Sequence, residues 1–218
     1  LACQDLRTYY PENSTLSFQL TLFGSSTQIA NRLVKALSQQ PLGLGVKKLP
    51  IKLQTLASHT PLGLRLGIHT LPLLAWLALE PPQVLQTLCL QLQSPLRLKQ
   101  RGKIIQQGQP PLTLLLNQIQ TRLAGLTKFW VDDSPQWQQL LQEKVSLGEY
   151  SNLTPVTYFE NWQRYSIARQ RHLPFGGLLG EFGYQGDIHN ALIWLQLGQL
   201  LQLGGKTTFG LGTYQLLT

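Results

Sequence analysis

Apolar residues recur along the first 57 positions with two different spacings. Apolar and polar residues alternate over 15–23, which predicts a strand with one buried face. Apolar residues at helical spacing over 29–37 then predict a short helix, which the glycines of 41–45 end. The segment 46–56 resumes an extended pattern. The predicted order in this region is therefore strand, helix, glycine loop, strand.

A longer regular region begins at residue 84, after a stretch rich in Leu, Pro and Gly that shows no clear period. Alternation predicts strands, and apolar stripes at helical spacing behind a double proline predict a helix. A basic extended arm over 96–105 is expected to end in a turn at 106–109, and Ser134 opens a further short helix. The main predicted elements are a strand at 84–93, a helix from 110, strands at 152–166 and 176–187, a helix at 188–203 and a strand at 209–217.

This second region has the order β-α-β-β-α-β, apart from the short additional helix. That is the ferredoxin-like order, in which helices cover one face of a four-stranded antiparallel sheet. The first region supplies only a β-α-β half of the same unit. We therefore expect an α+β protein with tandem ferredoxin-like domains: an incomplete N-terminal domain at 1–57, a linker or hairpin at 58–83 and a C-terminal domain at 84–218.

The start of the chain agrees with an incomplete first domain. The sequence holds no methionine and opens on Leu1, so we expect it to be a fragment of a longer protein. Cys3 and Cys89 form no CxxC pair and match no metal-ligand spacing, which predicts a reduced cytoplasmic protein without a bound metal or cofactor. No apolar run is long enough for a membrane span, and no secretion signal is visible.

The net charge of the chain and its distribution indicate the kind of partner. Only 13% of residues are charged, yet the net charge is +8. No acidic residue lies between Pro81 and Val131, where six basic residues fall. Such a surface attracts polyanions, of which nucleic acid is the commonest in a cell, although a basic face kept for solubility is the alternative. The six basic residues are Arg97, Lys99, Arg101, Lys103, Arg122 and Lys128.

A glycine-rich loop around Lys206 joins the last predicted helix to the last strand. It is not a nucleotide-binding loop, because Leu200 stands where that motif needs glycine and because the motif runs from strand to helix. A tight connection without a ligand is one reading. Glycines that bring the backbone close to RNA phosphate are the other, and we favour it. The predicted RNA-binding residues here are Gly205, Lys206, Thr207, Thr208, Gly210 and Gly212.

The segment 43–48 repeats the pattern of helix, glycine loop with lysine, and strand, which suggests an internal duplication. Lys47 and Lys48 are therefore also predicted to contact RNA.

Arginines and aromatic residues interleave over 161–172, near the tip of a predicted hairpin. Guanidinium groups pair with phosphates, and exposed aromatic rings stack on unpaired bases. We assign Arg164, Arg169 and Arg171 to RNA binding and expect Trp162 to be a core residue.

An ordered series of motifs extends this pattern. Trp162-Gln-Arg-Tyr-Ser, the glycines of 176–180, and Gly-Lys-Thr-Thr-Phe-Gly-Leu-Gly-Thr-Tyr at 205–214 resemble the C-terminal domain of CRISPR repeat-processing endoribonucleases. These enzymes belong to the repeat-associated (RAMP) superfamily of tandem ferredoxin-like proteins. The similarity covers 84–218 well and extends more weakly to the strand ending at Gly24 and to the loop at 43–45.

The resemblance implies metal-independent cleavage of CRISPR repeat RNA, with a 2′,3′-cyclic phosphate product and a histidine as general base. In the family this histidine usually lies in the first helix of the N-terminal domain, a part that we expect this chain to lack. Among His59, His69, His172 and His189, we choose His172 as the candidate, because it lies in the arginine cluster.

The expected partners are CRISPR repeat RNA and, beyond it, other CRISPR proteins or a fused CRISPR module. Two alternatives remain open at this point. One is a non-catalytic RAMP subunit that holds guide RNA in an effector complex, and the other is a generic basic RNA-binding domain.

Overall fold

The chain divides into two compact units. Leu1–Thr21, Pro81–Gly125 and Ser134–Thr218 form the larger unit, and Leu22–Glu80 with Leu126–Asp133 form the smaller one. The computed structural model describes residues 10–39, 43, 48–77, 86–131, 139, 141–142, 144–166 and 168–217.

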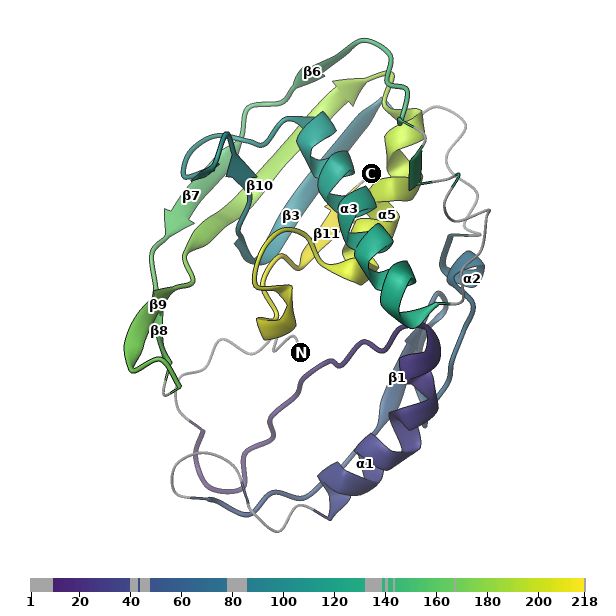
Figure 1. Ribbon diagram of the computed structural model, residues 1–218, viewed down its shortest axis with the longest axis vertical. Helices are drawn as coiled ribbons and strands as arrows, with labels where there is room; N and C mark the ends of the chain where they lie inside the picture. The colour runs from purple at the N-terminus through teal and green to yellow at the C-terminus, as the bar shows by residue number, and fades with distance from the viewer. Residues whose placement is uncertain are drawn as a thin grey trace. The chain divides into compact units, whose positions relative to one another are not determined.

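The larger unit is built on one antiparallel sheet in the order β11-β3-β10, with β6 and β7 both pairing with β10 beyond it. The helices α3 and α5 lie on one face of this sheet (Figure 1). The chain order strand, helix, two strands, helix, strand and the position of the first strand beside the last together confirm the ferredoxin-like α+β fold. The bounds are β3 (Thr87–Leu96), α3 (Leu112–Trp130), β6 (Tyr150–Asn152), β7 (Val156–Glu160), β10 (Gly177–Gly186), α5 (His189–Leu201) and β11 (Tyr214–Leu217).

The alternation in the sequence decides which face of the sheet is buried. Leu88, Leu90 and Leu92 of β3 are buried under the helices, while the intervening residues of the strand face away from this core. The stripe predicted for α3 is buried as well, at Leu112, Leu115, Leu116, Ile119 and Leu123. On α5, 46% of Ile193 is exposed, whereas its neighbour Trp194 is buried.

Two buried tyrosines of the sheet donate hydrogen bonds to the backbone of the helical layer and of the segment before it. The hydroxyl of Tyr184 donates a 2.6 Å hydrogen bond to the carbonyl oxygen of Pro110, just before α3. The hydroxyl of Tyr214 donates one of the same length to the carbonyl oxygen of Leu195 in α5. Burial raises the pKa of both phenols, because the charged phenolate loses its solvation.

Two short hairpins extend from the sheet of the larger unit. The first consists of β4 (Lys99–Gln100) and β5 (Lys103–Ile104) and turns tightly at Arg101-Gly102, where both residues have positive φ. The turn was expected at 106–109, so the basic arm folds back earlier than its sequence predicted. The second hairpin, β8 (Gln163–Ser166) with β9 (Arg171–Pro174), confirms the predicted one and lies in the chain between β7 and β10.

The smaller unit contains the short 3₁₀ helix η1 (Gly24–Ile29), α1 (Ala30–Ser38), the hairpin of β1 (Ala57–Thr60) and β2 (Gly63–Leu66), and α2 (Leu73–Leu77). The helix expected at 29–37 is confirmed. None of the described residues of this unit is buried.

The strands expected at 15–23 and 46–56 are absent from the described residues of those ranges, apart from isolated bridge positions at Gln19 and Leu49. A strand persists only where a neighbour pairs with its backbone, and alternation alone does not supply that neighbour. Of the helix expected from Ser134, the structure describes only Gln139, Leu141 and Gln142, all helical. None of the described helices combines the length and the hydrophobicity that a membrane crossing needs.

Candidate nucleic-acid interface

The glycine-rich loop is fixed to the end of β3 and to the start of β10. The backbone N–H of Gly205 donates a 2.8 Å hydrogen bond to the carbonyl oxygen of Arg97, and that of Gly212 donates a 3.1 Å bond to Pro95. The guanidinium of Arg97 donates a 2.7 Å hydrogen bond to the carbonyl oxygen of Gly176. Arg97 therefore connects the loop with the base of the β8–β9 hairpin.

The glycines shape the loop rather than offer free donors. Gly212 has φ of 79°, and a Cβ there would overlap the carbonyl oxygen of Leu203. The N–H of Gly210 donates to the carbonyl oxygen of Thr207, so the amides of Gly205, Gly210 and Gly212 are all used within the protein. The cradle of glycine amides expected around phosphate is therefore not formed by these three groups.

The side chains of the loop divide between core and solvent. Thr207 is buried, with 6% of its surface exposed, whereas Thr208 and Phe209 in the short helix η2 (Thr207–Phe209) are exposed. Lys206 precedes this helix in the left-handed conformation, with φ of 67°. The loop thus presents a lysine, a threonine hydroxyl and an aromatic ring to a ligand.

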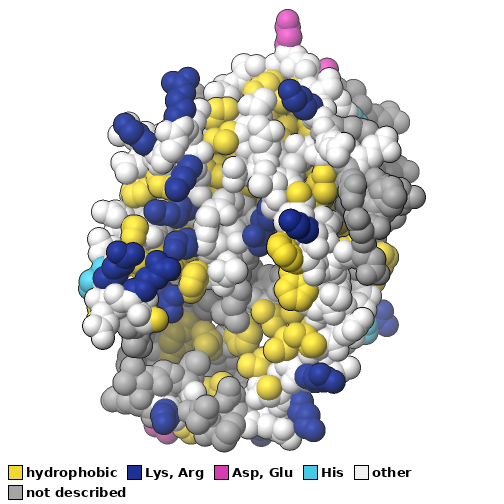
Figure 2. Space-filling model, in the orientation of Figure 1, with side chains coloured by type: hydrophobic (Ala, Val, Ile, Leu, Met, Phe, Trp, Pro, Cys, Tyr) yellow, Lys and Arg dark blue, Asp and Glu magenta, His cyan; other side chains and the backbone are white. Residues whose placement is uncertain are grey.

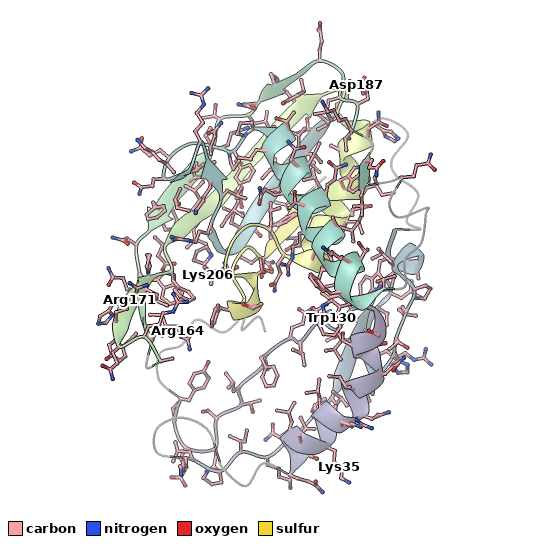
Figure 3. All side chains as sticks on the ribbon, in the orientation of Figure 1. Lys35, Trp130, Arg164, Arg171, Asp187 and Lys206 are labelled. Atoms are coloured by element: carbon pink, nitrogen blue, oxygen red, sulfur yellow. The ribbon has the colours of Figure 1, made fainter. Side chains whose placement is uncertain are left out.

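Two cations lie against a pair of aromatic rings where the loop meets the hairpin. The rings of Phe175 and Phe209 meet edge to face, 5.1 Å between centroids. Cζ of Arg164 lies 4.7 Å from the centroid of Phe209, and Nζ of Lys206 lies 5.2 Å from that of Phe175. Trp162 packs on Phe175 at 5.0 Å. We call these five residues the aromatic–cation cluster; Figure 3 labels Arg164 on the hairpin and Lys206 on the loop.

The rings of this cluster differ in exposure. Phe175 is 1% exposed and anchors the cluster in the core, whereas Phe209 is 48% exposed. Trp162, expected to be a core residue, is 38% exposed and covers Phe175 from the side. Exposed aromatic rings beside cations are typical of surfaces that hold single-stranded nucleic acid. Phe209 could have been found in the sequence, because it is an aromatic residue inside a glycine- and threonine-rich loop.

Strand register separates the predicted site residues of the hairpin onto two faces. Arg164 pairs with Leu173 and Ser166 pairs with Arg171, which places Arg164 and Arg171 on the same face. Tyr165 pairs with His172 on the opposite face, with 5.2 Å between the ring centroids. His172 is exposed and does not share the face on which Arg164 contacts Phe209.

The remaining predicted site residues are scattered. Arg169 lies exposed in the turn between β8 and β9, where its N–H donates a 3.2 Å hydrogen bond to the carbonyl oxygen of Ser166. Lys48 is exposed and belongs to the smaller unit, while Lys47 lies outside the described residues, as does most of the glycine loop around it.

The other histidines lie elsewhere in the fold. His59 is an exposed residue of β1, His69 accepts or donates a 2.7 Å hydrogen bond with the carbonyl of Leu66, and His189 begins α5.

Exposed basic side chains also lie on the β4–β5 hairpin of the larger unit. Lys99, Arg101 and Lys103 of the β4–β5 hairpin are exposed. Figure 2 shows Lys and Arg side chains gathered over this hairpin and over the β8–β9 hairpin. Arg122 differs, because its Nε donates to the carbonyl oxygen of Leu201 at the end of α5. Burial lowers the pKa of the Arg122 guanidinium. This side chain links α3 to the end of α5 and therefore contributes to the packing of the two helices.

Across the part of the chain that the structure describes, no three His, Cys, Asp or Glu side chains gather as a metal site would require.

The first structure described below shares this fold, and two further structures match over part of the chain. A Cas6 product complex is 18% identical, with a TM-score of 0.52, and the match covers 88% of this chain and 72% of that one. Cas6 of Thermus thermophilus is 15% identical over 66% of this chain and 58% of that one, with a TM-score of 0.37. A partial Cas6-RT-Cas1–Cas2 complex is 21% identical over 66% of this chain, with a TM-score of 0.43.

The chain is shorter than several of these proteins. It spans 24% of the matched chain of that partial complex and 55% of the chain in another Cas6 product complex. No curated protein matches the sequence.

The sequence itself matches a protein family over residues 90–214, which is more than half of the chain. The matched segment runs from β3 to the start of β11 and contains both the β8–β9 hairpin and the glycine-rich loop. The family is the CRISPR-associated endoribonuclease Cas6, and the chain belongs to it.

Proposed function

We propose that the chain, alone or as part of a longer protein, binds CRISPR repeat RNA and cleaves it to produce mature guide RNA. The observation that carries the proposal is the meeting of the hairpin and the glycine-rich loop. Arg164 from one and Lys206 from the other lie on the Phe175–Phe209 ring pair, in a member of an endoribonuclease family.

The contacts to RNA phosphate come from side chains. Arg164 and Arg171 share one face of the hairpin, and Arg169 lies at its tip. Lys206 and the exposed Thr208 supply the contacts of the loop. The N–H groups of Gly205 and Gly212 bond the loop to Arg97 and Pro95, and that of Gly210 closes the turn on Thr207, whose side chain is buried. Lys47 and Lys48 offer a further contact from the smaller unit.

The proposed cleavage needs no metal ion. A ribose 2′-hydroxyl loses its proton to a general base and attacks the adjacent phosphorus, and the bond to the 5′-oxygen of the next nucleotide breaks. The leaving 5′-oxygen takes up a proton, so the products are a 2′,3′-cyclic phosphate and a 5′-hydroxyl. Cations close to the phosphate stabilise the negative charge that develops on its oxygens.

His172 is the candidate base within this chain. Histidine is the side chain most often used for proton transfer in catalysis. Its position on the far face from Arg164 favours the alternative, in which the base comes from outside residues 1–218. His172→Ala distinguishes the two. Cleavage that falls by roughly 10²–10⁴-fold at unchanged RNA affinity assigns the base to His172, and unchanged cleavage assigns it elsewhere.

The activity is tested by incubating the protein with its cognate repeat RNA in EDTA. A discrete product that ends in a 2′,3′-cyclic phosphate supports the proposal, and a substrate with a single 2′-deoxy substitution at the cleavage position is the control that must stay intact. Binding without cleavage supports a non-catalytic RAMP subunit instead. Equal affinity for repeat and random RNA supports a generic RNA-binding domain.

Other CRISPR proteins or a fused CRISPR module complete the proposed set of partners. RNA processing of this kind takes place where precursor RNA is made, so we place the protein in the cytoplasm.

A further inference from the structure

We infer that Phe209 and Arg164 form a stacking site for one unpaired nucleobase of the bound RNA. This inference rests on the proposed RNA binding and goes beyond it. The cations of the cluster account for contacts with phosphate, and the inference adds a contact with a base. The stretch of RNA at the glycine-rich loop is then single-stranded.

The ring of Phe209 is held in place from one side and open on another. Its contact with Phe175 is edge to face, at 74° between the ring planes, and Phe175 is buried. The ring therefore has an anchored orientation although 48% of the residue is exposed. An aromatic ring with a fixed orientation loses little conformational entropy when a planar ligand stacks on it.

Arg164 adds a second planar group to this ring. Its Cζ lies 4.7 Å from the centroid of Phe209, and the residue itself is exposed. Guanidinium planes stack on nucleobases as aromatic rings do. A base can therefore stack on the guanidinium of Arg164, or on the exposed part of Phe209 beside Arg164.

Lys206 lies beside these groups and adds a contact for the phosphate of the same nucleotide. Its Nζ is 5.2 Å from the ring of Phe175, which is the ring that supports Phe209. A lysine binds phosphate as a point charge, whereas the half-exposed ring of Phe209 makes no favourable contact with a phosphate. The two together fit a phosphate and a base. Bases inside a duplex have both faces covered by their neighbours, so an unpaired base is the group that suits this ring.

The test compares two probes of equal length on the full chain: a single-stranded oligoadenylate and an abasic ribose-phosphate oligomer. Phe209→Leu keeps the apolar contact with Phe175 and removes the stacking ring. Arg164→Lys keeps the charge and removes the planar group. We expect each substitution to weaken oligoadenylate binding by roughly 5–50-fold, within the range for loss of one stacked base. Phe209→Leu should leave binding of the abasic oligomer unchanged. Arg164→Lys should weaken binding of the abasic oligomer less than binding of oligoadenylate, because Arg164 also contacts phosphate.

Phe209→Tyr is the matched control, since it retains a ring of the same shape and is expected to bind oligoadenylate as the original protein does. Equal losses on both probes, no loss on either, or a Phe209→Tyr variant as weak as Phe209→Leu would each overturn the stacking site. A direct readout that does not depend on affinity is 2-aminopurine fluorescence in an otherwise identical oligomer. Binding should quench it, and Phe209→Leu should abolish the quenching at saturating protein.

Failure of this inference is separate from failure of the proposed function. If the original protein binds both oligomers with equal affinity, stacking is wrong and RNA processing stands. If it shows the base-dependent difference but leaves repeat RNA intact, the stacking site stands and the cleavage proposal fails. If it binds neither oligomer, the stacking site fails, and cleavage of the repeat RNA alone decides the proposed function.

Discussion

The guanidinium of Arg97 donates a 2.7 Å hydrogen bond to the carbonyl oxygen of Gly176. Through its own carbonyl oxygen, Arg97 also accepts a 2.8 Å hydrogen bond from the N–H of Gly205. One residue at the end of β3 therefore fixes the glycine-rich loop with its backbone and the base of the β8–β9 hairpin with its side chain. The two segments that carry the aromatic–cation cluster are positioned by this residue.

Replacing Arg97 by methionine keeps most of the side-chain stem and removes the donor to Gly176. We expect the free energy of unfolding to fall by about 1–3 kcal/mol, because the lost bond is charge-assisted and partly buried, and RNA affinity to fall with it. Urea unfolding measures the first effect. Arg101→Met, an equal change in the exposed turn of the β4–β5 hairpin, should stay within about 0.5 kcal/mol; equal effects of the two changes would contradict this role of Arg97.

Gly212→Ala and Gly102→Ala form a matched pair. Their φ angles are 79° and 80°, so both substitutions place alanine in the left-handed region. A Cβ at Gly212 overlaps the carbonyl oxygen of Leu203, whereas one at Gly102 meets nothing within 4 Å. We expect Gly102→Ala to cost about 1–2 kcal/mol and Gly212→Ala distinctly more. Thermal unfolding of the two variants decides this, and an equal loss of stability would mean that the loop relaxes freely around the new methyl group.

Replacing Lys206 and Arg169 together by alanine should weaken RNA binding and flatten its salt dependence. Each lost phosphate contact lowers the slope of log K against log salt by roughly 0.7 for single-stranded RNA. Binding isotherms at several salt concentrations give this slope. Lys206→Arg should retain it. Lys35→Ala, in α1 of the smaller unit, tests whether net charge alone matters; a similar flattening there would argue against Lys206 as a phosphate contact.

Stability should fall as the pH rises above about 10, where tyrosines of the unfolded chain ionise. Burial raises the pKa of Tyr184 and Tyr214 in the folded protein, so the folded state keeps protons that the unfolded state releases. Each tyrosine then contributes a loss of up to about 1.4 kcal/mol per pH unit.

The double substitution Tyr184→Phe with Tyr214→Phe isolates this effect, because other groups titrate equally in both proteins. Denaturant unfolding across this pH range should give a shallower decline for the variant, although its stability near neutral pH is lower after the loss of two buried hydrogen bonds. Parallel curves for the two proteins would show that these phenols are accessible to water.

Much of the candidate site could be named from the sequence, and its arrangement could not. The hairpin arginines and Lys206 were predicted as RNA contacts from charge and composition. The contact between Arg164 and Phe209 joins residues 45 positions apart in the chain, and no local pattern indicates it. The opposite placement of His172 and Arg164 depends on the strand register within β8 and β9, which the sequence of an exposed hairpin leaves open.

The sequence by itself determined the fold of the larger unit, because its apolar residues repeat at the spacing of the elements that bury them. β3 and α3 follow their patterns closely, since a misplaced register would expose leucines to water. The tertiary structure alone decided the role of the glycines and the absence of strands at 15–23 and 46–56 from the described residues. Both depend on which backbone lies alongside: the end of β3 approaches Gly205 and Gly212, and no strand pairs regularly with the described residues of those two segments.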